Sequence, residues 1–153
     1  MRLDVSDSLG YIPEMESIYD PVRQKDVVMT PEEQVRQELV TWLHLQKGVP
    51  LHLMETEFSL GSVKTGTKGR VDVIVHGFRQ GGGVTRPWLL AECKRPGESD
   101  WARLTVQVNR YLKLFMPEYV LLEIGSDRRI LQRCTTPDQL TQYRPVSDLP
   151  QFS

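Results

Sequence analysis

A strand covered on both faces is predicted at residues 88–94, where the sequence reads WLLAECK. Its residues are mostly apolar, whereas a strand with one face in water alternates apolar and polar residues. Such a strand needs packed layers on both sides of its sheet. The segment therefore predicts a layered α/β domain, with helices packed on a central sheet.

The elements predicted around this strand follow the order helix, three strands, helix, strand. Thr30 is a good N-cap for the first helix, and Glu33 follows three residues later as in a capping box. Gly48 and Pro50 end that helix. The remaining expected elements are strands at 54–60, 70–76 and 88–94, a second helix at roughly 99–116, a strand at 119–124 and a short strand near 129–134.

Length and composition indicate one globular domain over residues 1–153, with an irregular arm at 1–29 and a turn-rich tail at 135–153. The formal net charge is −1 and 39% of the residues are hydrophobic, which excludes global disorder. No apolar run approaches the ~20 residues of a membrane helix, and the first residues lack a secretory signal pattern. Two cysteines make no disulfide framework, so we expect a cytoplasmic protein.

Three charged residues lie within the predicted apolar strands. Asp72 is in the middle of GRVDVIV, and Glu92 precedes Lys94 by two positions in LAECK. Side chains alternate along a strand, so Glu92 and Lys94 point to the same face and Cys93 points away. Buried charges are costly without a partner or a function. A buried ion pair is the simpler explanation of Glu92 and Lys94 taken alone, but Asp72 in the neighbouring strand favours a functional site.

The order of these residues resembles that of the PD-(D/E)xK nuclease superfamily, and more closely the N-terminal nuclease domain of type I restriction enzyme R subunits in its stand-alone bacterial form. The motifs that carry the resemblance are DPVRQK at 20–25, TPEEQVRQ at 30–37, GRVDVIV at 69–75, LAECKRP at 90–96, and Gln107 with Tyr111. The resemblance implies a restriction-endonuclease-like core with a central mixed sheet flanked by helices.

The resemblance also implies a metal-dependent DNA nuclease that hydrolyses phosphodiester bonds. Asp72 and Glu92 would hold Mg²⁺, which Mn²⁺ would replace, with the backbone carbonyl of Cys93 as an extra ligand. Lys94 would orient or help deprotonate the attacking water. Zinc is not expected, because the histidines and cysteines show no ligand spacing.

Nucleases of this kind take a further carboxylate from the first helix. Helical geometry places Glu32 toward the face of Val35, while Glu33 turns away and is explained by the capping box. Glu32 is therefore the expected catalytic acid, with Arg36 as its partner or as a phosphate contact. An equally good explanation is that both glutamates only stabilise the helix N-terminus through its dipole.

The second helix and the loops supply the remaining candidate residues. Gln107 and Tyr111 resemble the Gln-x-x-x-Tyr element of related nucleases, which builds the site or contacts DNA, although core packing also explains Tyr111. DNA phosphates would be contacted by basic residues that solvation alone would also explain. These residues are Lys64, Lys68, Arg70 and Arg95.

Two other hypotheses remain open at this point. The first is a catalytically inactive module that keeps the fold and binds nucleic acid or a partner protein, as the near-neutral charge suggests. The second is a subunit active only when joined to a helicase or methyltransferase. No ATP site is expected, because Thr67 replaces the lysine of a phosphate-binding loop.

Overall fold

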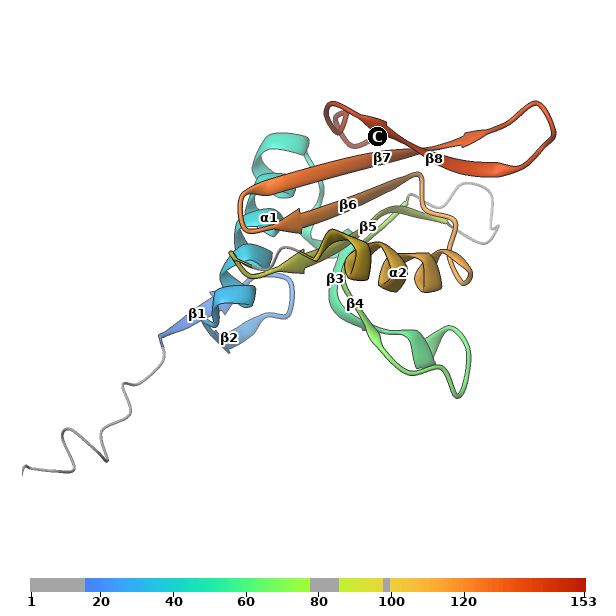
Figure 1. Cartoon of the computed structure of the whole chain (residues 1–153). Helices are drawn as coiled ribbons and strands as arrows, with labels where there is room; N and C mark the ends of the chain where they lie inside the picture. Colours follow the sequence, from blue (N-terminus) through green and yellow to red (C-terminus); the bar gives the residue numbers. More distant parts are fainter. Residues whose placement is uncertain (1–15, 78–85, 98–99) are drawn as a thin grey trace, which may run out of the picture.

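A six-stranded mixed sheet forms the centre of the molecule in the computed structural model, which describes residues 16–77, 86–97 and 100–153 (Figure 1). The strand order is β3-β4-β5-β6-β7-β8, and a two-stranded β1-β2 hairpin stands apart from this sheet. The strands are β1 (Ser17–Asp20), β2 (Lys25–Val28), β3 (Met54–Ser59), β4 (Arg70–His76), β5 (Pro87–Lys94), β6 (Tyr119–Ile124), β7 (Asp127–Thr135) and β8 (Thr141–Val146). Only β5 and β6 run parallel; every other neighbouring pair is antiparallel.

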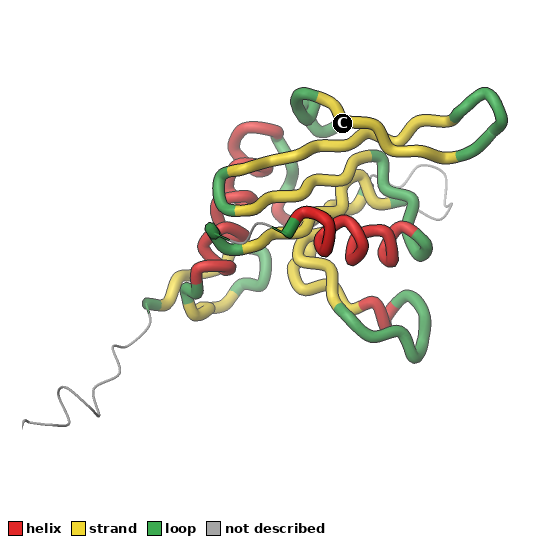
Figure 2. The backbone as a smooth tube through the Cα atoms, viewed as in Figure 1, coloured by secondary structure: helices red, strands yellow, loops and turns green. Residues whose placement is uncertain are grey.

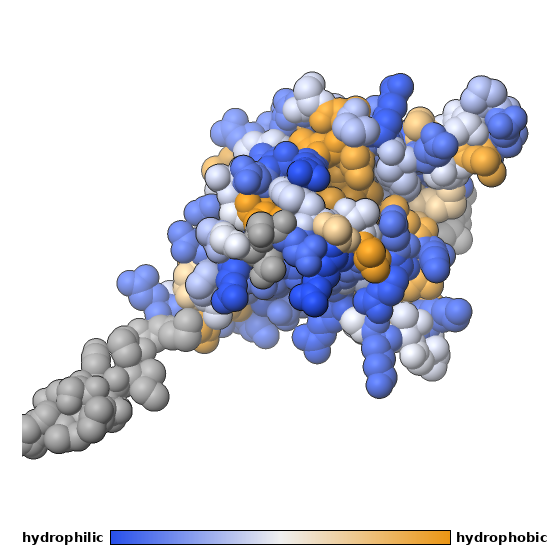
Figure 3. Space-filling model, in the orientation of Figure 1, coloured by the Kyte–Doolittle hydropathy of each residue, from blue (hydrophilic) through white to orange (hydrophobic). Residues whose placement is uncertain are grey.

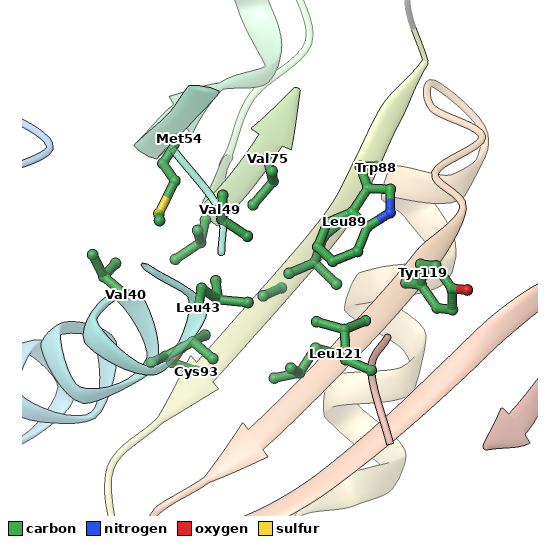
Figure 4. Close-up of a cluster of buried hydrophobic side chains, with 14 of the residues drawn as sticks. Val40, Leu43, Val49, Met54, Val75, Trp88, Leu89, Cys93, Tyr119 and Leu121 are labelled. Carbon is green, nitrogen blue, oxygen red and sulfur yellow. The ribbon is translucent and has the colours of Figure 1, made fainter. Parts of the chain in front are cut away.

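Helix α1 (Pro31–Lys47) covers one face of the sheet and helix α2 (Trp101–Leu112) covers the other (Figure 2). Side chains of α1, β4, β5 and β6 meet in the first apolar core, and Cys93 lies among them (Figure 4). The second core lies beneath α2, around Leu90, Leu104 and Tyr111. Strand β5 is therefore covered on both faces, as its sequence predicts, and the α/β fold with a restriction-endonuclease-like core is confirmed.

The ends of α1 follow the predicted capping residues. Thr30 Oγ1 accepts a hydrogen bond from Glu33 N (3.0 Å), and Gly48 closes the helix at φ +73°. Only half of the capping box forms, because Thr30 N donates to Val28 O (3.1 Å) and leaves the Glu33 carboxylate to other partners. Short 3-10 turns follow at Leu51–Leu53 and Leu60–Ser62.

The irregular arm predicted at residues 1–29 is corrected for its second half, because 17–28 form the β1-β2 hairpin; residues 1–15 lie outside the described residues. Asp20-Pro21 begins the hairpin turn, and Gln24 N donates to Asp20 O (2.7 Å) across it. The tail at 135–153 likewise contains β8, which pairs along the free edge of the nine-residue strand β7.

The alternation of side chains that a regular strand shows fails at one point in β3 and β4. Glu57 has φ +51°, a left-handed conformation that interrupts the regular pleat of β3. Phe58 therefore packs against the α2 core, although Met54 packs in the α1 core. On β4, Val71 likewise lies in the α2 core and Val73 in the α1 core. The β3-β4 hairpin bends at this point, beside Asp72.

The second helix ends earlier than the predicted boundary near residue 116. Helix α2 stops at Leu112, and Leu114 N and Phe115 N donate to Tyr111 O in a closing turn. Residues 98–99, where the predicted helix began, lie outside the described residues. Among the described residues, neither helix is long and apolar enough to cross a membrane.

Candidate active site

Asp72 and Glu92 meet where β4 separates from β5. The pairing of these strands stops at Val73 opposite Ala91, so the next backbone N–H groups lose their strand partners. Carboxylates replace those partners: Asp72 N donates to Glu92 Oε1 (3.1 Å), and Cys93 N donates to Asp72 Oδ2 (2.8 Å). The sheet therefore brings the two acids together at the end of its central strands.

Glu92 is almost fully enclosed, with 1% of its surface exposed. Burial and the negative charge of Asp72 raise the pKa of Glu92 well above its ordinary value, although Lys94 opposes the shift. Two carboxylates that share a buried position in this way repel each other. A cation between them would relieve that repulsion.

Lys94 ends β5 on the same side as Glu92, and Cys93 points into the α1 core, as predicted. Lys94 is half-buried and lines a pocket of about 430 Å³ at the N-terminal ends of α1 and α2. Arg95 and Arg103 line the same pocket, as does Glu32. The pocket therefore places three cations within reach of an anionic ligand, although neither Asp72 nor Glu92 lines it.

Gln107 joins α2 to the site. Its Nε2 donates to Glu92 Oε2 (3.4 Å) and to the hydroxyl of Tyr111 (2.7 Å), which in turn donates to Arg70 O (3.0 Å). Tyr111 is 1% exposed, so it does not offer its side chain to DNA, and the predicted DNA-contact role of Tyr111 is wrong. Burial first, then the charge of Glu92, raises the pKa of Tyr111 to about 12, so the hydroxyl remains a hydrogen-bond donor.

Arg36 links α1 to Asp72. Its Nη2 donates to Asp72 Oδ1 (3.1 Å) and its Nη1 donates to Glu33 Oε1 (2.9 Å). The side chain of Arg36 is 7% exposed. The expectation that Arg36 pairs with Glu32 or contacts a DNA phosphate is therefore corrected: it pairs with Glu33 and Asp72 and is buried.

The structure separates the two glutamates at the start of α1. Glu33, predicted to turn away from the sheet, is 7% exposed and accepts hydrogen bonds from Arg36 and Gln37, so that part of the prediction is wrong. Glu32 is half-buried and faces the pocket that contains Lys94. The catalytic role assigned to Glu32 stays a prediction, and its position in the pocket is compatible with it.

Apart from Arg36, the basic residues predicted to bind DNA are exposed. Lys64 and Lys68 are exposed on the loop between β3 and β4, which extends beyond the edge of the sheet (Figure 1). Arg70 is also exposed, with its Nη1 3.7 Å from Glu57 Oε2. The face that carries α2 is largely hydrophilic, apart from an apolar area over β6 and β7 (Figure 3).

The donor set at Asp72 and Glu92 consists of hard oxygens. Among residues 16–77, 86–97 and 100–153, no group of three or more His, Cys, Asp and Glu side chains is arranged to hold a metal ion. Two carboxylates still fit Mg²⁺, which is commonly held by one or two carboxylates, with waters and substrate phosphates completing its shell. The repulsion between Asp72 and Glu92 is consistent with such an ion. Closed zinc sites use more protein ligands.

Arg23 and Asp20 were not singled out by the sequence reasoning, yet they contact the site's ion-pair network. Arg23 Nη2 donates to Glu33 Oε1 (2.7 Å), and its Nε donates to Asp20. The DPVRQK motif at 20–25 contains both residues. That motif could have pointed to these two residues, but its contact with α1 could not be predicted from the sequence.

The order of elements, with two acids and a lysine at the end of the central strands, defines a restriction-endonuclease-like domain. Residues 31–150 match the family described as the type I restriction enzyme R protein N terminus, and the chain belongs to this family. A search of curated proteins found no match, and a search of solved structures found none either.

Proposed function

We propose that the protein is a Mg²⁺-dependent nuclease that hydrolyses phosphodiester bonds of DNA, with endonucleolytic cleavage related to restriction. The observation that carries the proposal is the meeting of Asp72 and Glu92 at the separated ends of β4 and β5, with Lys94 close enough for its charge to act on Glu92. Membership of the restriction enzyme R protein family supports the same class of reaction.

Asp72, Glu92 and the carbonyl of Cys93 would hold the ion. When bound, Mg²⁺ supplies an acidified water and neutralises charge on the phosphate oxygens. Lys94, at the pocket wall, would orient the attacking water or help to deprotonate it. Arg36 fixes Asp72, and Gln107 fixes Glu92, so both carboxylates keep their direction. Glu32 lies across the same pocket as a further acid.

DNA is the proposed substrate, and its phosphates would enter the pocket lined by Lys94, Arg95 and Arg103. These cations would neutralise the backbone without reading base sequence. Attachment to a helicase or methyltransferase subunit is the proposed biological setting, based on the family described for R proteins.

Cleavage of supercoiled plasmid in Mg²⁺ and in Mn²⁺ tests the proposal. We expect Asp72→Asn and Lys94→Met to lose cleavage by at least about a hundredfold, because each removes a group from the reacting centre. Asp26→Asn, on the exposed surface of β2, and Lys113→Met, just after α2, are matched controls. Wild-type rates in both site variants would contradict the proposal.

A catalytically inactive module is the second candidate, and one contact favours it. Arg36 already places a cation 3.1 Å from Asp72 Oδ1, which neutralises this acid without a metal. Calorimetry with Mn²⁺ and plasmid cleavage distinguish the two: absence of cleavage supports the inactive module, whether or not Mn²⁺ binds, and carboxylate-dependent binding together with cleavage supports the nuclease.

A further inference from the structure

We propose that Arg23, in the turn of the β1-β2 hairpin, is a positioning residue for the candidate active site, acting on Asp72 through Glu33 and Arg36. The inference rests on the proposed function for its catalytic consequence. Its structural part, that Arg23 helps to determine the position of the Arg36 guanidinium, is argued from hydrogen bonds and ion pairs alone. The hairpin precedes residues 31–150, so the family match does not cover it.

The first half of the connection anchors Arg23 in the hairpin. Asp20 is fully buried and accepts hydrogen bonds from Val22 N (2.9 Å) and from Arg23 Nε. Arg23 Nη2 then donates to Glu33 Oε1 at 2.7 Å. The guanidinium is therefore held between an acid of the hairpin and an acid of α1.

The second half leads from Glu33 to Asp72. Glu33 Oε1 also accepts from Arg36 Nη1 (2.9 Å), and Gln37 Nε2 fixes the other oxygen (3.1 Å). Arg36 Nη2 donates to Asp72 Oδ1 (3.1 Å). Acid and base thus alternate from the hairpin to the site, and one carboxylate oxygen is shared by both arginines.

Charge balance explains why Arg23 affects Arg36 without touching Asp72. Glu33 and Glu57 are each shared: Glu57 lies 3.7 Å from Arg23 and 3.5 Å from Arg36. Glu57 is exposed and also lies near Arg70, so the buried acid that depends on Arg23 is Glu33. Without Arg23, Glu33 has only Arg36 as its ion-pair partner, and a buried charge without full compensation is strongly unfavourable. Arg36 is then drawn toward Glu33, and its hold on Asp72 weakens.

The first measurement does not depend on nuclease activity. In the protein labelled with ¹⁵N at arginine, the Nε–H signal of Arg36 is assigned by its loss in Arg36→Lys. We expect Arg23→Met to shift this signal, and Lys25→Met not to shift it. Lys25 is the matched control, because it is exposed on the same hairpin and forms no ion pair with a described residue. An Arg36 signal unchanged in Arg23→Met overturns the inference.

The second measurement is the kinetics of DNA cleavage. A positioning role predicts that Arg23→Met lowers kcat by about tenfold or more while KM for DNA stays unchanged, because the reacting groups are misplaced but the DNA surface is intact. Raised KM with normal kcat would make Arg23 a DNA contact and overturn the positioning role. An inactive wild type refutes the proposed function, and the Arg36 signal still decides the structural part.

Arg23→Lys keeps the experiment decisive if Arg23→Met does not fold. Lysine retains the charge, but its ammonium lacks the planar fork that joins Asp20 to Glu33. We expect this variant to fold, to shift the Arg36 signal and to lose part of kcat. Wild-type kcat and an unshifted signal in Arg23→Lys would overturn the inference.

Discussion

At the scale of single residues, Glu92 lies in the candidate site although ionising its buried carboxylate destabilises the fold. Its carboxylate is buried beside Asp72, and burial followed by that negative charge raises its pKa above the ordinary value of 4.5. Glu92→Gln keeps an oxygen for Asp72 N and removes the charge. We expect it to raise the free energy of unfolding by about 1 kcal/mol at neutral pH while abolishing cleavage. Urea unfolding and plasmid cleavage measure the two effects.

The pH dependence of the same variant has a defined sign. The native state binds the Glu92 proton more tightly than the unfolded chain does, so wild-type stability falls as pH rises above about 4.5. The advantage of Glu92→Gln therefore grows from acidic to neutral pH. The exposed isosteric control, Glu38→Gln, should stay within about 0.5 kcal/mol of wild type. A destabilised Glu92→Gln would show that the ionised carboxylate is fully compensated.

At the scale of elements, the β1-β2 hairpin depends on Asp20. Burial alone would raise the pKa of Asp20, but hydrogen bonds from Arg23 and from Val22 N outweigh it, and the net pKa lies below the ordinary 3.8. We expect Asp20→Asn to lower the free energy of unfolding by about 2 kcal/mol at pH 7. The difference persists above pH 3.8 and shrinks as pH falls through the lowered pKa.

Denaturant unfolding at pH 7, 5 and 3 measures this effect, and the exposed hairpin residue Asp26→Asn is the control. An equal loss of stability at every pH would mean that Asp20 contributes through shape and not through its charge.

The elements themselves were largely predictable, because local chemistry defines their ends. Thr30 and Gly48 bound α1 as their capping preferences require, and the apolar composition of 119–124 matches β6 residue for residue. The β1-β2 hairpin was missed because Asp20-Pro21 signals a turn but not the strands on either side of it. The break in side-chain alternation at Glu57 was missed because Glu57 adopts φ +51°, a left-handed conformation that glycine usually marks in a sequence.

The candidate site was predictable where residues are close along one strand and not where it depends on packing. The common face of Glu92 and Lys94 follows from alternation, and Gln107 with Tyr111 follows from helical spacing. The burial of Glu33 was missed because a capping role seemed to account for it. Its carboxylate instead binds Arg23 and Arg36. Sequence periodicity indicates which face of an element is buried, but it does not indicate that α1 contacts the β1-β2 hairpin.

At the scale of the whole molecule, a net charge of −1 makes DNA binding depend on where cations gather. Lys64 and Lys68 are exposed on the β3-β4 loop. If both contact phosphates, Lys64→Ala with Lys68→Ala should weaken DNA binding equally for all sequences. The slope of log K against log salt should fall by about two, one for each phosphate contact.

Fluorescence anisotropy with labelled duplex at several salt concentrations measures that slope. Arg144→Ala is the control, since Arg144 is exposed on β8, at the opposite edge of the sheet from β3. The loop variant should keep wild-type kcat at saturating DNA, because its lysines act before the chemical step. An unchanged slope together with a lowered kcat would instead place the loop in the reacting site, and DNA would then have to approach across β3 and β4.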